Sequence, residues 1–367
     1  MSDCRDEGRV VVAMSGGVDS SLAAALLVDQ GYEVTGVSMR LAPDDSRVGS
    51  SGCCSQEDFE DAACVAAELG VPHYVFDMRE RFRRSVMQPF ADEYLAGRTP
   101  SPCVLCNREL KFDLLRRKAR ELGISLVATG HYARRDRVNG RYRLRRAADE
   151  FKDQSYFLFE MGQEELADTL FPVGDLTKDS VRRLASEKRL VVAAKPESQE
   201  ICFVPDGHYA EVVQRLRPEG ATAGSIIDET GRVLGRHDGV HRFTVGQRRG
   251  LGISAPLPLY VSAIDAMAGT VTVSPRGNLL RAGLEASALS WTSGEASSPG
   301  CRISVKIRYR HPAVAATLEA VDHDRARVVF DHPQEAVAPG QAAVFYLGDE
   351  VLGGGWIDRA LTLEEAA

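Results

Sequence analysis

The chain has 367 residues, of which 44% are hydrophobic and 26% are charged, and its formal net charge is −7. This is ordinary globular composition, and the length suggests two or three domains. The acidic net charge argues against a protein that coats nucleic acid indiscriminately. The first residues, MSDCRDEGR, are charged where a signal peptide would be apolar, and no window approaches about eighteen consecutive apolar residues. We therefore expect a cytoplasmic protein without a membrane span.

The first half of the chain alternates short apolar runs with amphipathic stretches. RVVVAM, EVTGVSMRL, HYVFD and SLVATGHYAR have the β-branched composition of strands, and SLAAALLVDQG and EDFEDAACVAAELG between them have the pattern of helices. Strands that alternate with helices predict a parallel sheet covered on both faces, hence an α/β domain. Ligands of such sheets bind at the carboxyl ends of the strands.

A basic hairpin is expected after these strands. Residues 133–146 contain seven arginines, and an Asn-Gly dipeptide divides them, so Arg141, Arg143 and Arg145 should share one face of a hairpin. A local basic face on an acidic protein suits a structured polyanion such as RNA. From about residue 210, short runs separated by Gly, Asp and Pro replace helical periodicity, which predicts small β domains or a β-barrel.

The segment VVVAMSGGVDSSLAAALL (10–27) places Ser-Gly-Gly-Val-Asp-Ser between the first strand and the first helix. Two glycines allow a tight turn and a close approach of a ligand, while helix amides and serine hydroxyls can donate to phosphate. The lysine of the common G-x-x-x-x-G-K-[ST] phosphate loop is missing. The motif instead resembles the PP-loop of ATP pyrophosphatases, which leaves the α-phosphate open to attack and releases pyrophosphate.

The cysteines are candidates for the group that attacks an adenylated substrate. Cys103 and Cys106 lie three residues apart in TPSPCVLCNRE, and a helix that begins at Asn107 would favour the thiolate of Cys106. Cys202, in ESQEICFVP, could act as its partner if it lies nearby. A C-x-x-C pair also suits a redox dithiol or half of a zinc site, but there is no second pair to complete the zinc site.

Motifs along the whole chain resemble the tRNA-specific 2-thiouridylases. They are AMSGGVDSS, TPSPCVLCNRELKF, ATGHYAR, KDQSYFL, FPVGDLTK, ICFVP, TVGQRRGLGI, KIRYRH, PGQAAVFY and VLGGGWI. The resemblance implies a PP-loop domain at residues 1–209, a small central β domain at 210–275 and a C-terminal β-barrel at 276–367. It implies an enzyme that adenylates the C2 oxygen of the wobble uridine of tRNA and replaces that oxygen with sulfur, releasing AMP and pyrophosphate.

The resemblance also assigns residues. Cys106 is the nucleophile that faces the base, and Cys202 receives sulfur as a persulfide from a donor protein; the two can form a disulfide. ATP, with Mg²⁺, is expected at Ala13, Met14, Ser15, Gly16, Gly17, Val18, Asp19, Ser20, Met39 and Gly130. The flipped base of the anticodon stem-loop is expected at Ser101, Pro102 and Cys103, and other parts of the tRNA at Lys152, Asp153, Gln154, Arg308 and Tyr309. The resemblance implies no DNA and no membrane partner.

The segment before the nucleophile departs from the family pattern. It is Ser101-Pro102-Cys103, where well-known members have Asn-Pro-Asp, so the role of that Asp cannot be transferred to Cys103. Three cysteines can ligate a [4Fe–4S] cluster with one iron left open, and related PP-loop thiolases use such a site. Cys103, Cys106 and Cys202 could therefore hold a cluster, and the persulfide relay is the competing account.

Other features allow simpler interpretations. Cys64 is expected in the core on the apolar face of its helix, Cys53 and Cys54 in a loop, and His131 in a structural or ligand-contacting position.

Two alternative functions stay open at this point. One is a PP-loop ligase that acts on a small molecule, and the other is a non-catalytic iron–sulfur or RNA-binding protein. The intact SGGVDS motif argues against the second.

Overall fold

The computed structural model describes residues 8–41, 56–197, 201–204, 207–322 and 324–366. The chain divides into two compact units. The first comprises residues 1–86, 103–207 and 349–351, and the second comprises 87–102, 208–348 and 352–367. Cys4, Cys53 and Cys54 lie outside the described residues.

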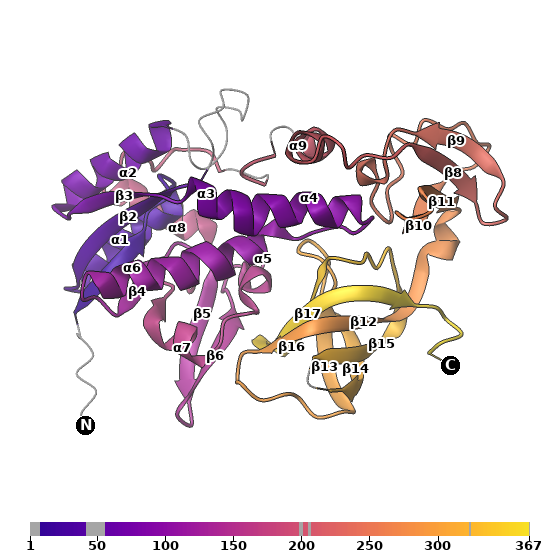
Figure 1. Ribbon diagram of the computed structural model, residues 1–367. Coiled ribbons are helices and arrows are strands. Elements are labelled where there is room, and N and C mark those ends of the chain that lie inside the picture. Colours follow the sequence, from indigo (N-terminus) through magenta and orange to yellow (C-terminus); the bar gives the residue numbers. More distant parts are fainter. Residues whose placement is uncertain (1–7, 42–55, 198–200, 205–206, 323, 367) are drawn as a thin grey trace. The chain divides into compact units, whose positions relative to one another are not determined.

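The first unit contains a five-stranded parallel sheet with the order β3-β2-β1-β4-β7. Its strands are β1 (Arg9–Ala13), β2 (Glu33–Arg40), β3 (His73–Asp77), β4 (Leu126–Thr129) and β7 (Thr169–Leu170). Strands β2, β3 and β4 of this sheet are labelled in Figure 1. Ala13 at the end of β1 is in register with Val37 and Thr129. The ends of β1 and β4 and the later part of β2 therefore meet at one edge, as expected for a ligand site in a parallel sheet.

Helices cover both faces of this sheet, as the sequence predicts. Val10 and Val12 share a core with α1 (Val18–Asp29), α2 (Gln56–Leu69) and α8 (Lys178–Glu187). Val11 points the other way and packs with residues of α6 (Leu115–Glu121). Successive side chains of a strand point to opposite faces, so the apolar run at residues 10–12 supplies both cores.

Two long helices contain π-helical turns. In the first, α3 (Arg79–Phe82) continues through a π-helical segment, Arg83–Met87, into α4 (Gln88–Leu95). In the second, α5 (Pro102–Cys106) continues through Asn107–Leu114 into α6. The prediction that a helix begins at Asn107 is therefore wrong. The helix begins at Pro102, since proline is favoured in the first turn of a helix and serine is favoured directly before it.

The predicted hairpin is confirmed as β5 (Ala133–Val138) and β6 (Arg141–Arg146), joined by Asn139-Gly140, both with positive φ (51° and 83°). This is the conformation that a two-residue hairpin turn requires. The first unit is completed by a 3-10 turn at Ser155–Leu158 and by α7 (Gln163–Asp168).

Cys64 is exposed, so its predicted core position is wrong. The buried face of α2 is formed by Ala62, Val65 and Ala66.

The second unit contains α9 (Tyr209–Leu216), although the sequence suggested that helical structure ends near residue 210. A four-stranded sheet follows with the order β10-β11-β8-β9. Its strands are β8 (Gly224–Asp228), β9 (Val233–His237), β10 (Tyr260–Asp265) and β11 (Thr270–Ser274), with a 3-10 turn at Val240–Arg242. Ile226, Val261, Val271 and Val273 form its core.

The C-terminal part of the second unit is a closed β-barrel. After a 3-10 turn at Arg276–Leu279 come β12 (Leu280–Trp291), β13 (Cys301–Lys306), β14 (Val314–Val321), β15 (Arg325–Glu335), β16 (Ala342–Leu347) and β17 (Glu350–Leu361). The order is β12-β15-β14-β13-β16-β17, and β12 also pairs with β17, which closes the ring. No helix among the described residues is long and apolar enough to cross a membrane.

Candidate functional site

The SGGVDS loop connects β1 to α1 at the carboxyl edge of the parallel sheet. The Ser20 hydroxyl holds the loop closed, because it accepts from the Ser15 amide at 3.1 Å and donates to the Gly17 carbonyl at 3.1 Å. The Ser38 hydroxyl donates to the Met14 carbonyl at 2.7 Å and so ties the loop to β2. The loop is therefore organised by its own hydrogen bonds, with the amino end of α1 beside it.

The two glycines of the loop have different structural roles. Gly16 has φ 72°, and a Cβ there would lie 2.2 Å from the carbonyl oxygen of Asp58. Gly17 has φ −95°, and a Cβ there would meet only the Ser15 hydroxyl at 3.6 Å, an ordinary contact. The fold therefore requires glycine at position 16 but not at position 17.

The other predicted nucleotide-binding residues lie at the same edge. Gly130 directly follows β4, and a Cβ on it would lie 2.6 Å from the Ser20 amide nitrogen, so it packs against the first turn of α1. Met39 is half-buried near the end of β2, opposite Phe76 of β3. Ala13 and Val18 flank the loop, and the side chains of Met14 and Val18 are buried in the core. These two residues can therefore offer a ligand only their backbone.

Lys178, which the sequence analysis missed, lies beside the loop. Its Nζ atom lies 2.7 and 2.9 Å from the two carboxylate oxygens of Asp19, and it also pairs with Glu197. The Tyr132 hydroxyl donates to Asp19 at 2.7 Å, and the Tyr132 ring lies 5.8 Å from Nζ. Lys178 thus supplies from α8 the positive charge that the loop lacks in sequence.

One signal in the sequence could have identified Lys178. It is the first residue of α8, where Thr177 caps the helix. A cation is unfavourable at the positive end of a helix dipole, so a lysine there needs another reason. The carboxylates of Asp19 and Glu197 provide that reason in this structure.

Glu197 joins two lysines near the segment that carries Cys202. It accepts from Lys152 at 2.6 Å and pairs with Lys178. Partial burial opposes its ionisation, but the hydrogen bonds from Lys152 and Lys178 outweigh that effect and lower its pKa. Lys152, predicted to contact tRNA, therefore has a carboxylate partner within the protein.

The neighbouring predicted tRNA contacts have internal partners. Asp153 is buried and accepts hydrogen bonds from the Ala147 amide at 3.1 Å and from the Ser155 hydroxyl at 2.9 Å. The Gln154 side chain accepts from the Tyr132 amide at 2.9 Å. The structure gives both side chains a role in holding this turn, and their contact with tRNA stays a prediction.

The cysteine helix is connected to the same turn. The Asn107 side chain, directly after Cys106, donates to the Phe157 carbonyl at 3.0 Å. Cys106 is buried, while Cys103 is partly exposed in the first turn of α5. Because the helix begins at Pro102, its free amides lie near Cys103, and the expected activation of Cys106 by a helix start is not present.

Cys202 lies in a turn that an aromatic contact anchors. Phe203 is buried and packs edge-to-face on Phe82 of α3, with ring centroids 5.5 Å apart. Cys103, Cys106 and Cys202 form no disulfide in the structure. Among the residues that the structure describes, no three His, Cys, Asp or Glu side chains are grouped so that they could hold a metal ion. The hypothesis that Cys103, Cys106 and Cys202 ligate a [4Fe–4S] cluster therefore gains no support from this structure.

His131 is buried at the end of β4. Its Nδ1 atom and the Thr129 hydroxyl are 2.8 Å apart in a hydrogen bond. Burial, with the positive charge of Lys111 as a smaller cause, holds the pKa of His131 well below its ordinary value. It therefore stays neutral, which fits the structural interpretation.

The remaining predicted tRNA contacts belong to the second unit. Ser101 and Pro102 are buried, and the preceding carbonyls of Thr99 and Pro100 accept from Gln341 at 2.9 and 3.1 Å. Arg308 and Tyr309 follow the end of β13 in a turn, where Arg308 is exposed.

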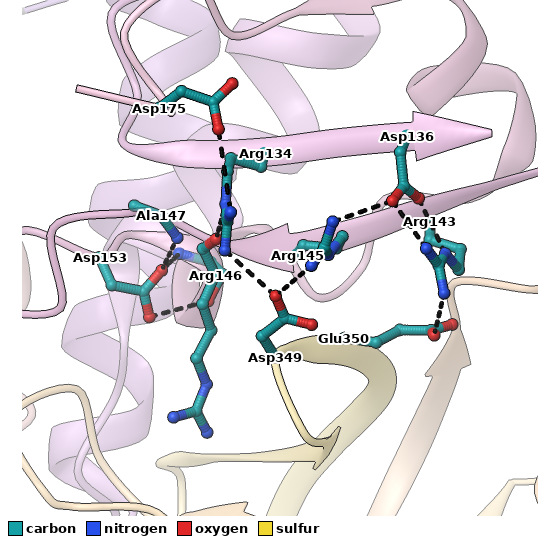
Figure 2. A network of polar contacts seen from close by, with 11 residues as sticks. Arg134, Asp136, Arg143, Arg145, Arg146, Ala147, Asp153, Asp175, Asp349 and Glu350 are labelled. Carbon is teal, nitrogen blue, oxygen red and sulfur yellow. Dashed lines mark hydrogen bonds and ion pairs between the residues drawn. The ribbon is translucent and has the colours of Figure 1, made fainter. Parts of the chain in front are cut away.

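Three arginines of the hairpin, Arg134, Arg143 and Arg145, have carboxylate partners (Figure 2). Asp136 accepts from Arg143 at 2.7 Å and from Arg145 at 3.0 Å. Asp349 accepts from Arg134 at 3.1 Å and also binds Arg145. Two arginines of the expected basic face, Arg143 and Arg145, are thus paired with carboxylates. Asp136 belongs to the hairpin itself, and Asp349 is brought to it by the fold.

Three family profiles match the chain in sequence order. They are described as a tRNA methyl transferase HUP domain (residues 8–206), a tRNA methyl transferase PRC-barrel domain (211–275) and an aminomethyltransferase beta-barrel domain (281–357). A tRNA-specific 2-thiouridylase MnmA from Geobacter metallireducens is 51% identical, and the similarity covers 96% of this chain and 98% of that protein. The chain belongs to the MnmA family.

Other MnmA proteins are similarly close. That of Geotalea uraniireducens is 50% identical over 98% of this chain and 97% of its own length, and that of Solibacter usitatus is 50% identical over 96% and 100%. The family predicted from the motifs is confirmed, and so is the fold class, a parallel-sheet domain followed by β domains. The three profiles follow one another along the chain. The domain boundaries at residues 209 and 275 stay a prediction.

Proposed function

We propose that this MnmA family member is an ATP-dependent tRNA uridine 2-sulfurtransferase that makes 2-thiouridine at the wobble position. The similarity over nearly the full length of proteins named tRNA-specific 2-thiouridylase carries the proposal. The first unit supports it, because the phosphate-type loop, Lys178 and the buried Cys106 all belong to it. Since the reaction needs ATP and tRNA, we place it in the cytoplasm.

The residues present fit ATP with Mg²⁺. The backbone of Gly16 and Gly17 and the amino end of α1 can receive phosphate oxygens, and Lys178 adds a positive charge. Asp19 offers a carboxylate, the donor that Mg²⁺ prefers beside phosphate oxygens and water. Mg²⁺ bound there would neutralise charge on the phosphates and so favour the departure of pyrophosphate.

The chemistry has two stages. The C2 oxygen of uracil attacks the α-phosphate of ATP, a P–O bond breaks, and pyrophosphate leaves, so that the oxygen becomes part of a good leaving group. A persulfide sulfur on Cys202 then attacks C2 and displaces AMP. The Cys106 thiolate attacks the S–S bond that links the base to Cys202, which leaves 2-thiouridine and a Cys106–Cys202 disulfide for a thiol reductant to reopen.

The sulfur on Cys202 comes from a persulfide donor protein by exchange. The terminal sulfur passes to the Cys202 thiolate, and the donor leaves as a thiolate. Cys106 and Cys202 are not joined by a disulfide in the structure, as in the reduced enzyme that begins this cycle. We favour this relay over the iron–sulfur cluster, because Cys103, Cys106 and Cys202 are not grouped as three metal ligands. No step requires iron.

The proposal is tested by reconstitution with unmodified tRNA, ATP, Mg²⁺ and a persulfide source, run anaerobically with and without added iron. We expect AMP, pyrophosphate and 2-thiouridine in equal amounts, from colourless protein that contains no iron. Pyrophosphate release with a small acid or amide and without tRNA would instead support a ligase. Thiolation that depends on iron would favour the cluster.

A further inference from the structure

The central part of the second unit carries exposed arginines that differ from those of the hairpin. Residues 239–264 contain three arginines, Arg242, Arg248 and Arg249, and no aspartate or glutamate, and the exposed Asp238 directly precedes them. Arg248 and Arg249 are exposed in this stretch, and Arg236 is exposed on β9. Their guanidinium groups form no ion pair or hydrogen bond with any residue that the structure describes. We name Arg236, Arg248 and Arg249 the central arginine surface.

The loop that carries Arg248 and Arg249 is held in place by its own hydrogen bonds. The Gln247 side chain accepts from the Thr244 amide at 2.9 Å and donates to the Arg249 carbonyl at 2.9 Å. Backbone hydrogen bonds at 2.8 and 3.0 Å tie Gly246 and Gln247 to Val261 of β10. The two arginines therefore extend from an ordered frame, which reduces the entropy lost on binding.

The same loop packs against β9 next to Arg236. A Cβ on Gly235 would lie 2.8 Å from Cγ2 of Ile253, so the loop and the strand are in close contact. Leu251 is buried in the core of this sheet and fixes the loop from beneath. Arg236 and the two arginines of the loop thus belong to neighbouring elements of one small sheet.

An open groove of about 440 Å³ lies within this loop. It is lined by Arg248, by residues 250–253 and by residues 255–259. Arg248 is the only charged residue in that lining. Leu257 is the only large hydrophobic side chain exposed in residues 239–264, all of which the structure describes. This surface has charge but little apolar area.

We propose that the central arginine surface binds the sugar-phosphate backbone of the tRNA substrate. The inference rests on the proposed function and adds a contact surface that the sequence motifs did not assign. Guanidinium groups present paired N–H donors that match phosphate oxygens, and such contacts position a nucleic acid without reading its sequence. A protein interface would need an apolar core, and the exposed Leu257 and Val233 of β9 do not provide one.

The test measures the dissociation constant of tRNA against salt concentration for Arg248→Ala/Arg249→Ala. Loss of two phosphate contacts should lower the slope of log K against log salt by about 2 and weaken binding roughly tenfold near ~0.1 M salt. Arg236→Ala should lower the slope by about 1. Arg248→Lys/Arg249→Lys keeps the charge and should keep most of the slope.

The matched control is Arg302→Ala/Arg359→Ala. It removes the same formal charge from exposed arginines of the same unit, but these are paired with Asp331 and Glu285. The control should bind tRNA with the wild-type slope. Thermal unfolding of each variant tests whether the fold is intact. Arg248→Lys/Arg249→Lys keeps both positive charges, so a loss of tRNA affinity in the alanine variant alone is due to charge.

Two results would overturn the inference. In one, the alanine double variant binds tRNA like the control. In the other, its tRNA affinity is unchanged while sulfur transfer from the persulfide donor protein is lost, which would assign the surface to that protein. Both leave the proposed function intact if the wild type makes 2-thiouridine. Failure of the wild type to make it would count against the proposed function itself.

Discussion

Lys178 and Asp19 form an ion pair at the nucleotide loop, with Nζ at 2.7 and 2.9 Å from the two carboxylate oxygens. The two residues are 159 positions apart in sequence. The pair places a cation from α8 beside the amino end of α1, where the proposed phosphates of ATP would lie. The loop therefore obtains from another helix the charge that other phosphate loops carry in their own motif.

Replacing Lys178 should impair adenylation. Lys178→Met removes the charge that would stabilise the departing pyrophosphate, so we expect tRNA-dependent AMP formation to fall by about 100-fold. The dissociation constant of tRNA should change little. The measurement is the rate of AMP release at saturating tRNA across a series of ATP concentrations.

Lys188→Met is the matched control, because Lys188 pairs with Asp29 at the far end of the same helix. It should retain wild-type AMP release. Thermal unfolding of both variants detects any loss of folding. If Lys178→Met releases AMP as fast as Lys188→Met, then Lys178 has no role in the reaction.

The two cysteines of the relay should be required after adenylation. Cys202→Ser should still release pyrophosphate in the presence of tRNA but should make no 2-thiouridine, because only the sulfur carrier is lost. Cys106→Ser should also make no 2-thiouridine, because the S–S bond that links the base to Cys202 would not be cleaved. Cys64→Ser, which changes an exposed cysteine of α2, is the control and should retain full activity. Thiolated product from Cys202→Ser would contradict the relay.

The two loop glycines should respond differently to alanine. Gly16→Ala forces a Cβ to 2.2 Å from a backbone oxygen at φ 72°, so it should distort the loop and lower the thermal midpoint. Gly17→Ala meets only an atom at 3.6 Å and should leave the midpoint unchanged. If ATP approaches the backbone at Gly17, this variant should nevertheless bind ATP at least about tenfold more weakly. Equal ATP affinity for Gly17→Ala and wild type would place the nucleotide elsewhere.

The carboxylates of the hairpin network should stabilise the fold in a pH-dependent way. The hydrogen bond from Arg143 lowers the pKa of Asp136, and that from Arg145 lowers the pKa of Asp349. A lowered carboxyl pKa contributes stability above the unfolded value of about 3.9, and this contribution is lost as the pH falls through the folded pKa. Asp136→Asn/Asp349→Asn should therefore unfold at lower urea than wild type at neutral pH.

This difference between variant and wild type should shrink progressively below about pH 4. Urea unfolding measured in steps between neutral pH and that range checks it. Asp175→Asn is the control, because its carboxylate is exposed and lies 3.8 Å from Arg134, at the limit of an ion pair. An unfolding difference that does not change with pH would mean that the asparagines act through packing instead of charge.

The local elements could be predicted from the sequence because neighbouring residues determine them. The apolar run at residues 10–12, the Gly-Gly turn and the Ala/Leu-rich segment predict the strand, loop and helix of the SGGVDS motif. Asn139-Gly140 predicts the hairpin, since both residues tolerate positive φ. The predicted start of the cysteine helix at Asn107 is wrong, although Ser101-Pro102, a pair that favours a helix start at Pro102, is present in the sequence.

What the sequence by itself determined is therefore the class of the sheet, the nucleotide loop and the family motifs, each of which depends on residues close together in the chain. Only the tertiary structure decided which distant groups meet. It brings Lys178 to Asp19, packs Gly130 on Ser20, and pairs Arg145 with Asp349, 204 positions away. The order of the strands and the packing of their helices determine these encounters, and local periodicity contains no information about which charges they bring together.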